Sequence, residues 1–129
     1  MDEVEPTLIV VEGYAMGFTR GQSRLADLGE LGGMVKLAFW ERGIDVMIAP
    51  PATLKSAIAE NGKADKNEIK AALRQRYGYH ITNPDEADAL GLMLLGEIRC
   101  GKTRLQAQAK RMASVTNCEV IRGQLKLRA

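Results

Sequence analysis

The chain has 129 residues, of which 46% are hydrophobic and 26% are charged, a composition typical of one ordinary globular domain. No apolar run reaches the roughly 20 residues that a membrane-spanning helix needs, and acids at positions 2, 3 and 5 exclude the basic start of a signal peptide. Cys100 and Cys118 lack the spacing of a zinc site, so we expect reduced thiols. These features predict a cytoplasmic protein without a membrane partner.

The net charge of +2 is unevenly distributed along the chain. Residues 1–97 carry 10 Lys/Arg and 15 Asp/Glu, which gives −5, whereas residues 98–129 carry 8 Lys/Arg and one acid, which gives +7. This division predicts a core over 1–97 and a basic C-terminal extension over 98–129. A basic segment indicates a polyanionic partner, with nucleic acid as the first candidate; the alternative is a solvated chain end.

The first predicted element is a strand over residues 7–11, which ends at Glu12 and Gly13. Its apolar, β-branched run predicts a strand buried on both faces. A helix is expected over 22–42, where glycines at 29, 32 and 33 indicate close approach to another element, a kink or a break. A second strand is predicted over 46–49, before Pro50 and Pro51.

Further helices are predicted over 53–60, 66–77, 84–96 and 103–113, and a short strand over 119–121. Asp65 and Glu68 form a capping-box pattern at the start of helix 66–77. In helix 84–96 we expect four apolar side chains to pack on the sheet: Ala87, Leu90, Met93 and Leu94. The succession of strand, helix, strand and helices predicts an α/β fold.

Two carboxylates, Asp85 and Asp88, stand three residues apart at the start of helix 84–96. Asn83 is a suitable N-cap and Pro84 suits the first helical position. Paired carboxylates of this kind supply the oxygen ligands of divalent-metal phosphoryl-transfer sites; the alternative is a solvated acidic turn. Because open α/β sheets place ligands at the carboxyl ends of their strands, we expect Glu12 to meet this pair there.

Three segments, in this order, resemble the RuvC-type Holliday junction resolvases, which have a ribonuclease H-like fold. Ile9-Val10-Val11-Glu12 resembles the family's strand that ends in a catalytic Glu. The stretch from Leu54-Lys55-Ser56 to Gly62-Lys63-Ala64-Asp65-Lys66 resembles a basic residue followed by a G-x-A-x-K loop. Asp85-Glu86-Ala87-Asp88-Ala89-Leu90 matches the family's D-x-x-D-A-L helix. The resemblance covers about residues 7–97 and implies a mixed sheet flanked by helices.

The resemblance implies a metal-dependent, structure-specific endonuclease that hydrolyses phosphodiesters in branched DNA such as a four-way junction. The implied ligands of two Mg²⁺ or Mn²⁺ ions are Glu12, Asp85 and Asp88, and Lys66 joins them as a catalytic residue near the scissile phosphate. Lys55 and Lys63 are implied DNA-binding residues; ordinary surface lysines are the alternative.

The resemblance also extends to partners and source. Tyr14 or Phe18 is expected to stack on a base of the opened junction, and Arg20 to contact DNA; a core-capping aromatic and a solvated arginine are the alternatives. The glycine-containing helix corresponds to the family's dimer region, which implies a homodimer. No phosphate-binding loop of the nucleotide-binding kind is present, so no nucleotide cofactor is expected. The implied setting is a bacterial or phage-infected cell.

The chain departs from the family pattern at its start. The family has a further Asp on a first strand, in an I-D-P-G-like stretch, and this strand forms the centre of the sheet. The resemblance therefore describes this fold as N-terminally truncated and its site as one carboxylate short. We expect weak or no nuclease activity, and the alternative function is a non-catalytic remnant of the fold that binds branched DNA.

Overall fold

The computed structural model describes residues 6–13, 22–101 and 114–124. Its sheet contains β1 (Leu8–Glu12), β2 (Asp45–Ala49) and β3 (Glu119–Ile121) in the order β1-β2-β3. β1 runs parallel to β2 with Val10 opposite Met47, and β3 runs antiparallel to β2 with Val120 opposite Met47. The mixed sheet and its helices confirm the predicted α/β class.

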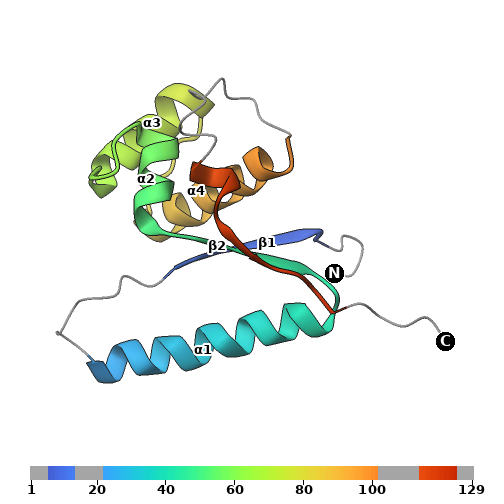
Figure 1. Cartoon of the computed structure of the whole chain (residues 1–129). Coiled ribbons are helices and arrows are strands. Elements are labelled where there is room, and N and C mark those ends of the chain that lie inside the picture. Colours follow the sequence, from blue (N-terminus) through green and yellow to red (C-terminus); the bar gives the residue numbers. More distant parts are fainter. Residues whose placement is uncertain (1–5, 14–21, 102–113, 125–129) are drawn as a thin grey trace.

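Helices cover both faces of this sheet (Figure 1). α1 (Gln22–Glu41) lies along one face, and α2 (Pro51–Ala59), α3 (Lys66–Tyr77) and α4 (Pro84–Arg99) form a layer on the other face. The order of the elements therefore gives a three-layer arrangement. The carboxyl ends of β1 and β2 lie at the same edge of the sheet, because the two strands are parallel.

Local capping residues explain why the helices begin and end near the predicted positions. The Asp65 side chain accepts a hydrogen bond from the Glu68 N–H at 2.8 Å, and the Asn83 side chain accepts one from the Asp85 N–H at 2.8 Å. Gly78 ends α3 in the left-handed conformation with φ 73°. α4 continues three residues beyond the predicted end at 96. The predicted helix over 103–113 lies outside the described residues.

The core lies between the sheet and the α2–α4 layer. Buried apolar side chains from all three helices meet β2 there, and the largest fully buried ones in this cluster are Met47, Ile58, Leu73, Leu95 and Val115. Of the residues of α4 that were predicted to pack on the sheet, Ala87 and Leu94 are buried and Leu90 packs against the core partly buried, but Met93 is 46% exposed. Val115, which precedes β3, shows that the C-terminal segment contributes to the same core.

β1 differs from the prediction of a strand buried on both faces. Its apolar residues are only partly buried, and it lies at the edge of the described sheet. α4 packs on one of its faces, whereas the side opposite β2 has no described neighbour. The apolar run therefore forms a parallel strand, as predicted, in an edge position.

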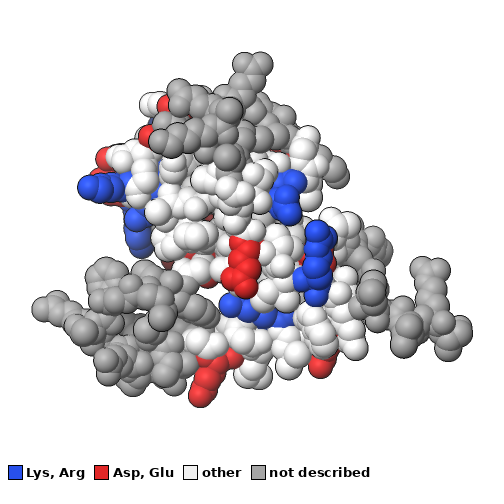
Figure 2. Space-filling view, in the orientation of Figure 1, with Lys and Arg blue, Asp and Glu red and all other residues white. Residues whose placement is uncertain are grey.

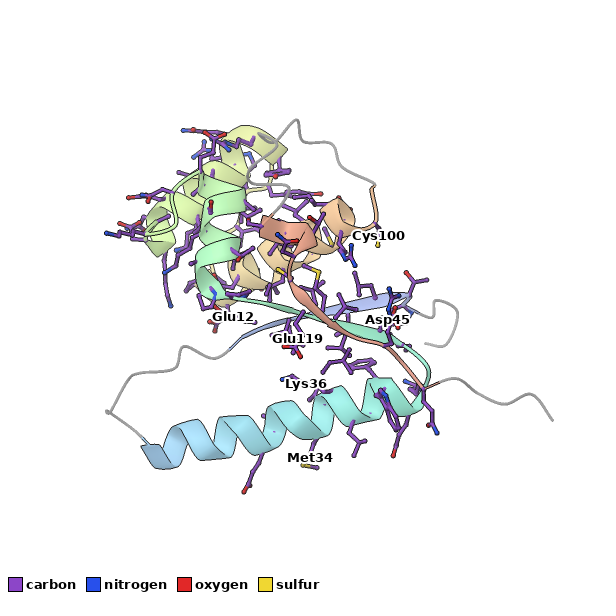
Figure 3. All side chains as sticks on the ribbon, in the orientation of Figure 1. Glu12, Met34, Lys36, Asp45, Cys100 and Glu119 are labelled. Atoms are coloured by element: carbon purple, nitrogen blue, oxygen red, sulfur yellow. The ribbon has the colours of Figure 1, made fainter. Side chains whose placement is uncertain are left out.

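α1 is continuous through its three glycines, so they produce no break. Gly29, Gly33 and Lys36 share one face of the helix by their spacing, and Figure 3 shows Lys36 pointing toward the sheet while Met34 points away from it. The outward face is apolar, with Leu31, Met34 and Leu37 between 52% and 69% exposed. Several large apolar side chains of α1 are therefore left exposed.

The start of β2 is held against the residues that follow β3. Asp45 accepts hydrogen bonds from the Arg122 guanidinium at 3.1 Å and from the Gly123 N–H at 2.8 Å. Gly43, with φ 77°, makes the turn that leads from α1 into β2. Among the described residues, no helix combines the length and apolar character needed to cross a membrane.

Candidate functional site

Glu12 is the last residue of β1, and the chain around it is fixed by backbone pairing. The Gly13 N–H donates to the Ala49 carbonyl at 2.8 Å, which extends the pairing of β1 and β2 to the end of both strands. A Cβ at Gly13 would lie 3.3 Å from Ile48 Cγ2, so glycine permits this close approach. Figure 3 shows Glu12 near the start of α2. Glu12 thus stands at the carboxyl edge of the sheet.

The charges of three side chains from three helices act on Glu12. Partial burial is the largest cause of a raised Glu12 pKa, and the negative charge of Asp88 raises it further, while Lys55 and Lys66 lower it. These are the groups that the sequence predicts at one site. The assignment of Glu12 and Asp88 to a shared site stays a prediction.

The loop before α3 positions Lys66. The Asn61 side chain accepts a hydrogen bond from the Lys63 N–H at 3.0 Å, and Ala64, only 1% exposed, anchors the loop in the core. Asp65 then caps α3, so that Lys66 becomes its first residue. These contacts hold the Lys66 backbone at a fixed point near Glu12. The loop-fixing role of Asn61 was missed from the sequence, although its Asn-Gly pair is a turn signal.

Asp85 and Asp88 have different surroundings, although both belong to the start of α4. Asp85 is exposed in the first turn, next to the Asn83 cap, and it is not among the charges that shift the Glu12 pKa. Asp88 is partly buried one turn further along. Ala87, only 2% exposed, fixes this turn against the core. Of the predicted pair, Asp88 is the member whose charge raises the Glu12 pKa.

The remaining predicted DNA contacts divide into two groups. Lys63 is exposed on the loop before α3, three residues from Lys66. Tyr14, Phe18 and Arg20 lie outside the described residues. On the face shown in Figure 2, acidic and basic side chains alternate without a continuous stripe of one charge.

The described residues offer few ligands to a metal ion. Within the described ranges, no three Asp, Glu, His or Cys side chains gather closely enough to hold a metal. A single Mg²⁺ is commonly bound by one or two carboxylates together with water and substrate phosphate. Glu12 and Asp88 therefore offer at most two carboxylates to an ion, fewer than the three that the family resemblance implies for a pair of ions.

The comparison with known proteins decides the family. The sequence profile described as "Crossover junction endodeoxyribonuclease RuvC" matches residues 1–96. The chain belongs to the RuvC family. The predicted resemblance is thereby confirmed, and the match includes β1 and the segments that carry Glu12, Lys55, Lys66 and Asp88.

Individual RuvC proteins agree with this assignment. The crossover junction endodeoxyribonuclease RuvC of Corynebacterium diphtheriae is 30% identical over 108 residues, which cover 83% of this chain and 64% of that protein. The RuvC of Mycobacterium ulcerans is 33% identical over 79 residues, which cover 61% of this chain and 42% of that protein. This chain therefore spans less than two thirds of the length of the relatives that it matches.

The fold comparison gives the same result. The structure of Thermus thermophilus RuvC superposes with a TM-score of 0.59 at 28% sequence identity, over 75% of this chain and 60% of that one. The three-stranded mixed sheet with helices on both faces is thus the RuvC arrangement, which is ribonuclease H-like. The predicted fold family is confirmed.

Proposed function

We propose that this protein binds branched DNA, such as a four-way junction, and acts on it as a metal-dependent endonuclease of the RuvC type. The observation that carries the proposal is the convergence of Glu12, Asp88, Lys55 and Lys66 at one edge of the sheet in a chain of the RuvC family. Carboxylates beside lysines suit a phosphodiester, because the former hold a cation and the latter offset phosphate charge.

Glu12 and Asp88 would hold one Mg²⁺ or Mn²⁺, which supplies Lewis-acid chemistry at a phosphate oxygen when bound. Lys66 and Lys55 would stabilise the negative charge that builds up on the phosphate, because both lie close enough to lower the Glu12 pKa. Lys63, on the same loop as Lys66, would contact the DNA backbone. These assignments are part of the proposal.

The proposed nuclease activity is weak for the chain of 129 residues. Among the described residues, no three carboxylate, histidine or cysteine side chains gather to hold a metal, and Asp88 is the carboxylate whose charge acts on Glu12. A second ion therefore lacks protein ligands, and an in-line displacement loses part of its charge stabilisation. The second candidate function, binding of branched DNA without cleavage, is favoured by this same shortage of carboxylates.

A synthetic four-way junction separates the two functions. Binding is measured in Ca²⁺ and cleavage in Mg²⁺ or Mn²⁺, each for the wild type, for Asp88→Asn and for Glu86→Gln, an exposed neighbour on the same helix. We expect slow cleavage by the wild type and by Glu86→Gln, none by Asp88→Asn, and binding by all three. Binding without cleavage in any metal would favour the non-catalytic function, and equal affinity for linear duplex would contradict both.

We also propose that the protein is a homodimer and that the basic segment 98–129 strengthens DNA binding. The exposed apolar side of α1 supports the dimer, because three large side chains there face solvent. The excess positive charge of +7 supports the role of the segment. Deletion of residues 125–129, which carry two cations of this segment, should lower the salt dependence of DNA affinity. An unchanged slope of log affinity against log salt concentration would contradict this role.

A further inference from the structure

One side of α3 carries a row of cations. Lys66, Lys70 and Arg74 follow one another at intervals of four residues, which places them on the same side of the helix. Lys66 and Arg74 are exposed and Lys70 is partly exposed. Because an α-helix rises 1.5 Å per residue, neighbouring members of this row are separated by about 6 Å along the helix axis, and the whole row is about 12 Å long.

The charges of this row are open to a ligand. Arg76, which lies outside the row, has a structural role: its guanidinium contacts Glu60 at 2.8 Å and donates to the Ile58 carbonyl at 3.4 Å, so that it holds α3 against the end of α2. For Lys70 and Arg74, the described part of the chain provides no ion pair and no side-chain hydrogen bond. Their side chains therefore have no such task in the fold.

The other exposed side of α3 has a different character. Helical spacing places Asn67, Glu68, Ala71 and Gln75 there, and all four are exposed. The only charge among them is that of Glu68, whose carboxylate accepts a hydrogen bond from the Asn61 side chain at 3.3 Å. The free positive charge of α3 is therefore directed to one side of the helix.

The row begins at the candidate site. Lys66 is the first residue of α3, and its charge acts on Glu12 at the carboxyl edge of the sheet. Lys70 and Arg74 follow at about 6 and 12 Å from Lys66 along the helix axis. Each strand of a DNA duplex carries one phosphate per 3.4 Å of duplex axis. The row is therefore as long as about three to four nucleotides of one strand.

We propose that Lys70 and Arg74 extend the candidate site into a track along α3 that binds the phosphate backbone of one arm of a branched DNA. This inference rests on the proposed binding of branched DNA at Glu12 and Lys66, and it adds the direction in which one strand leaves the site. Phosphate contacts fix the register and orientation of DNA without reading its sequence. The track would therefore hold an arm of any sequence.

The salt dependence of junction binding in Ca²⁺ tests the track. Lys70→Gln/Arg74→Gln removes both charges, and the further changes Ala71→Lys and Gln75→Arg restore the net charge on the other exposed side of α3. For the double variant we expect the slope of log affinity against log salt concentration to fall by about two, and affinity at about 0.1 M salt to fall by about tenfold or more. The fourfold variant should show the same loss. Recovery of affinity by the fourfold variant, or an unchanged slope for the double variant, would overturn the proposal.

Neutral methylphosphonate linkages locate the track on the DNA. They are introduced one at a time along each arm of a synthetic four-way junction. We expect about three neighbouring linkages of one strand to lower the affinity of the wild type by about fivefold or more, and to have no further effect on the double variant, because the contacts are already lost. Equal sensitivity of the two proteins at every linkage would overturn the track.

The variant Lys66→Gln separates this proposal from the function on which it rests. Affinity that depends on Lys66 but not on Lys70 or Arg74 would overturn the track and leave the proposed binding of branched DNA in place. A wild-type protein that binds no junction would overturn both.

Discussion

Glu12 shows how one residue connects the fold to the chemistry of the site. Burial at the end of β1 and the neighbouring Asp88 both disfavour its charge, and Lys55 and Lys66 offset only part of this effect. The net result is a pKa above the ordinary value of 4.5. A divalent cation between Glu12 and Asp88 would reverse the balance, because it favours both ionised carboxylates. The ionised Glu12 carboxylate therefore lowers the stability of the metal-free fold, and a bound cation would remove this cost.

Replacement of Glu12 by Gln should stabilise the metal-free protein at pH 7. Because the folded-state pKa is raised, the ionised carboxylate costs stability above that pKa, and the cost disappears below the unfolded value of 4.5, where both states are protonated. We therefore expect Glu12→Gln to have the higher Tm at pH 7 and the same Tm as wild type near pH 4.

The control is Glu30→Gln, a change at an exposed position of α1. Its Tm should equal that of the wild type at both pH values. Thermal unfolding with chelator present measures all three proteins. A lower Tm for Glu12→Gln at pH 7 would contradict the electrostatic environment described for this carboxylate.

Asp65 provides a second test at the scale of a residue. Its carboxylate accepts the Glu68 N–H at 2.8 Å, and this cap fixes the start of α3 where Lys66 lies. Asp65→Ala should lower the free energy of unfolding by about 1 kcal/mol. Asp65→Asn should keep most of the stability, because asparagine caps equally well. Urea denaturation measures both, and an equal loss for the two variants would show that charge, and not the cap, is responsible.

At the scale of elements, two helical glycines have opposite surroundings. A Cβ at Gly96 of α4 would lie 3.0 Å from Val10 Cγ2, whereas a Cβ at Gly29 of α1 meets no described atom within 4 Å. Alanine improves helix propensity by about 1 kcal/mol at either position, but overpacking in a tight contact costs about 1–3 kcal/mol.

We therefore expect Gly96→Ala to destabilise the protein and Gly29→Ala to stabilise it by about 1 kcal/mol. Urea denaturation of the two variants measures the difference. If Gly96→Ala were as stabilising as Gly29→Ala, α4 would lie further from β1 than in the structure. The groove between β1 and α4 would then have a different shape.

Elements with local signals could be predicted from the sequence, whereas their exposure could not. α3 begins and ends as predicted because Asp65 and Gly78 are local caps. The exposed side of α1 and the edge position of β1 depend on what packs against them, which a run of apolar residues does not specify. Glu12 and Asp88 could be brought together from topology, since parallel strands end at one edge. The different exposure of Asp85 and Asp88 could not, because it depends on how α4 is turned on the sheet.

At the scale of the whole molecule, two apolar surfaces remain without a described neighbour. One is the groove between β1 and α4, which is lined by residues 7–10 and by Met93 and Gly96 of α4. The outward side of α1 carries Leu31 at 59%, Met34 at 69% and Leu37 at 52% exposure. An open helix face of this kind can pack on its own copy about a twofold axis, because the same patch is then buried on both subunits.

Met34 and Met93 form a matched pair that distinguishes the two surfaces. Met34→Glu places a charge at the proposed dimer face, and a charge at the centre of such an interface should weaken dimerisation by at least about tenfold. Met93→Glu places the same charge in the groove between β1 and α4, on the opposite face of the sheet from α1, and should leave dimerisation unchanged. Sedimentation over a range of concentrations measures both. Dissociation by Met93→Glu alone would move the dimer interface to the groove beside β1.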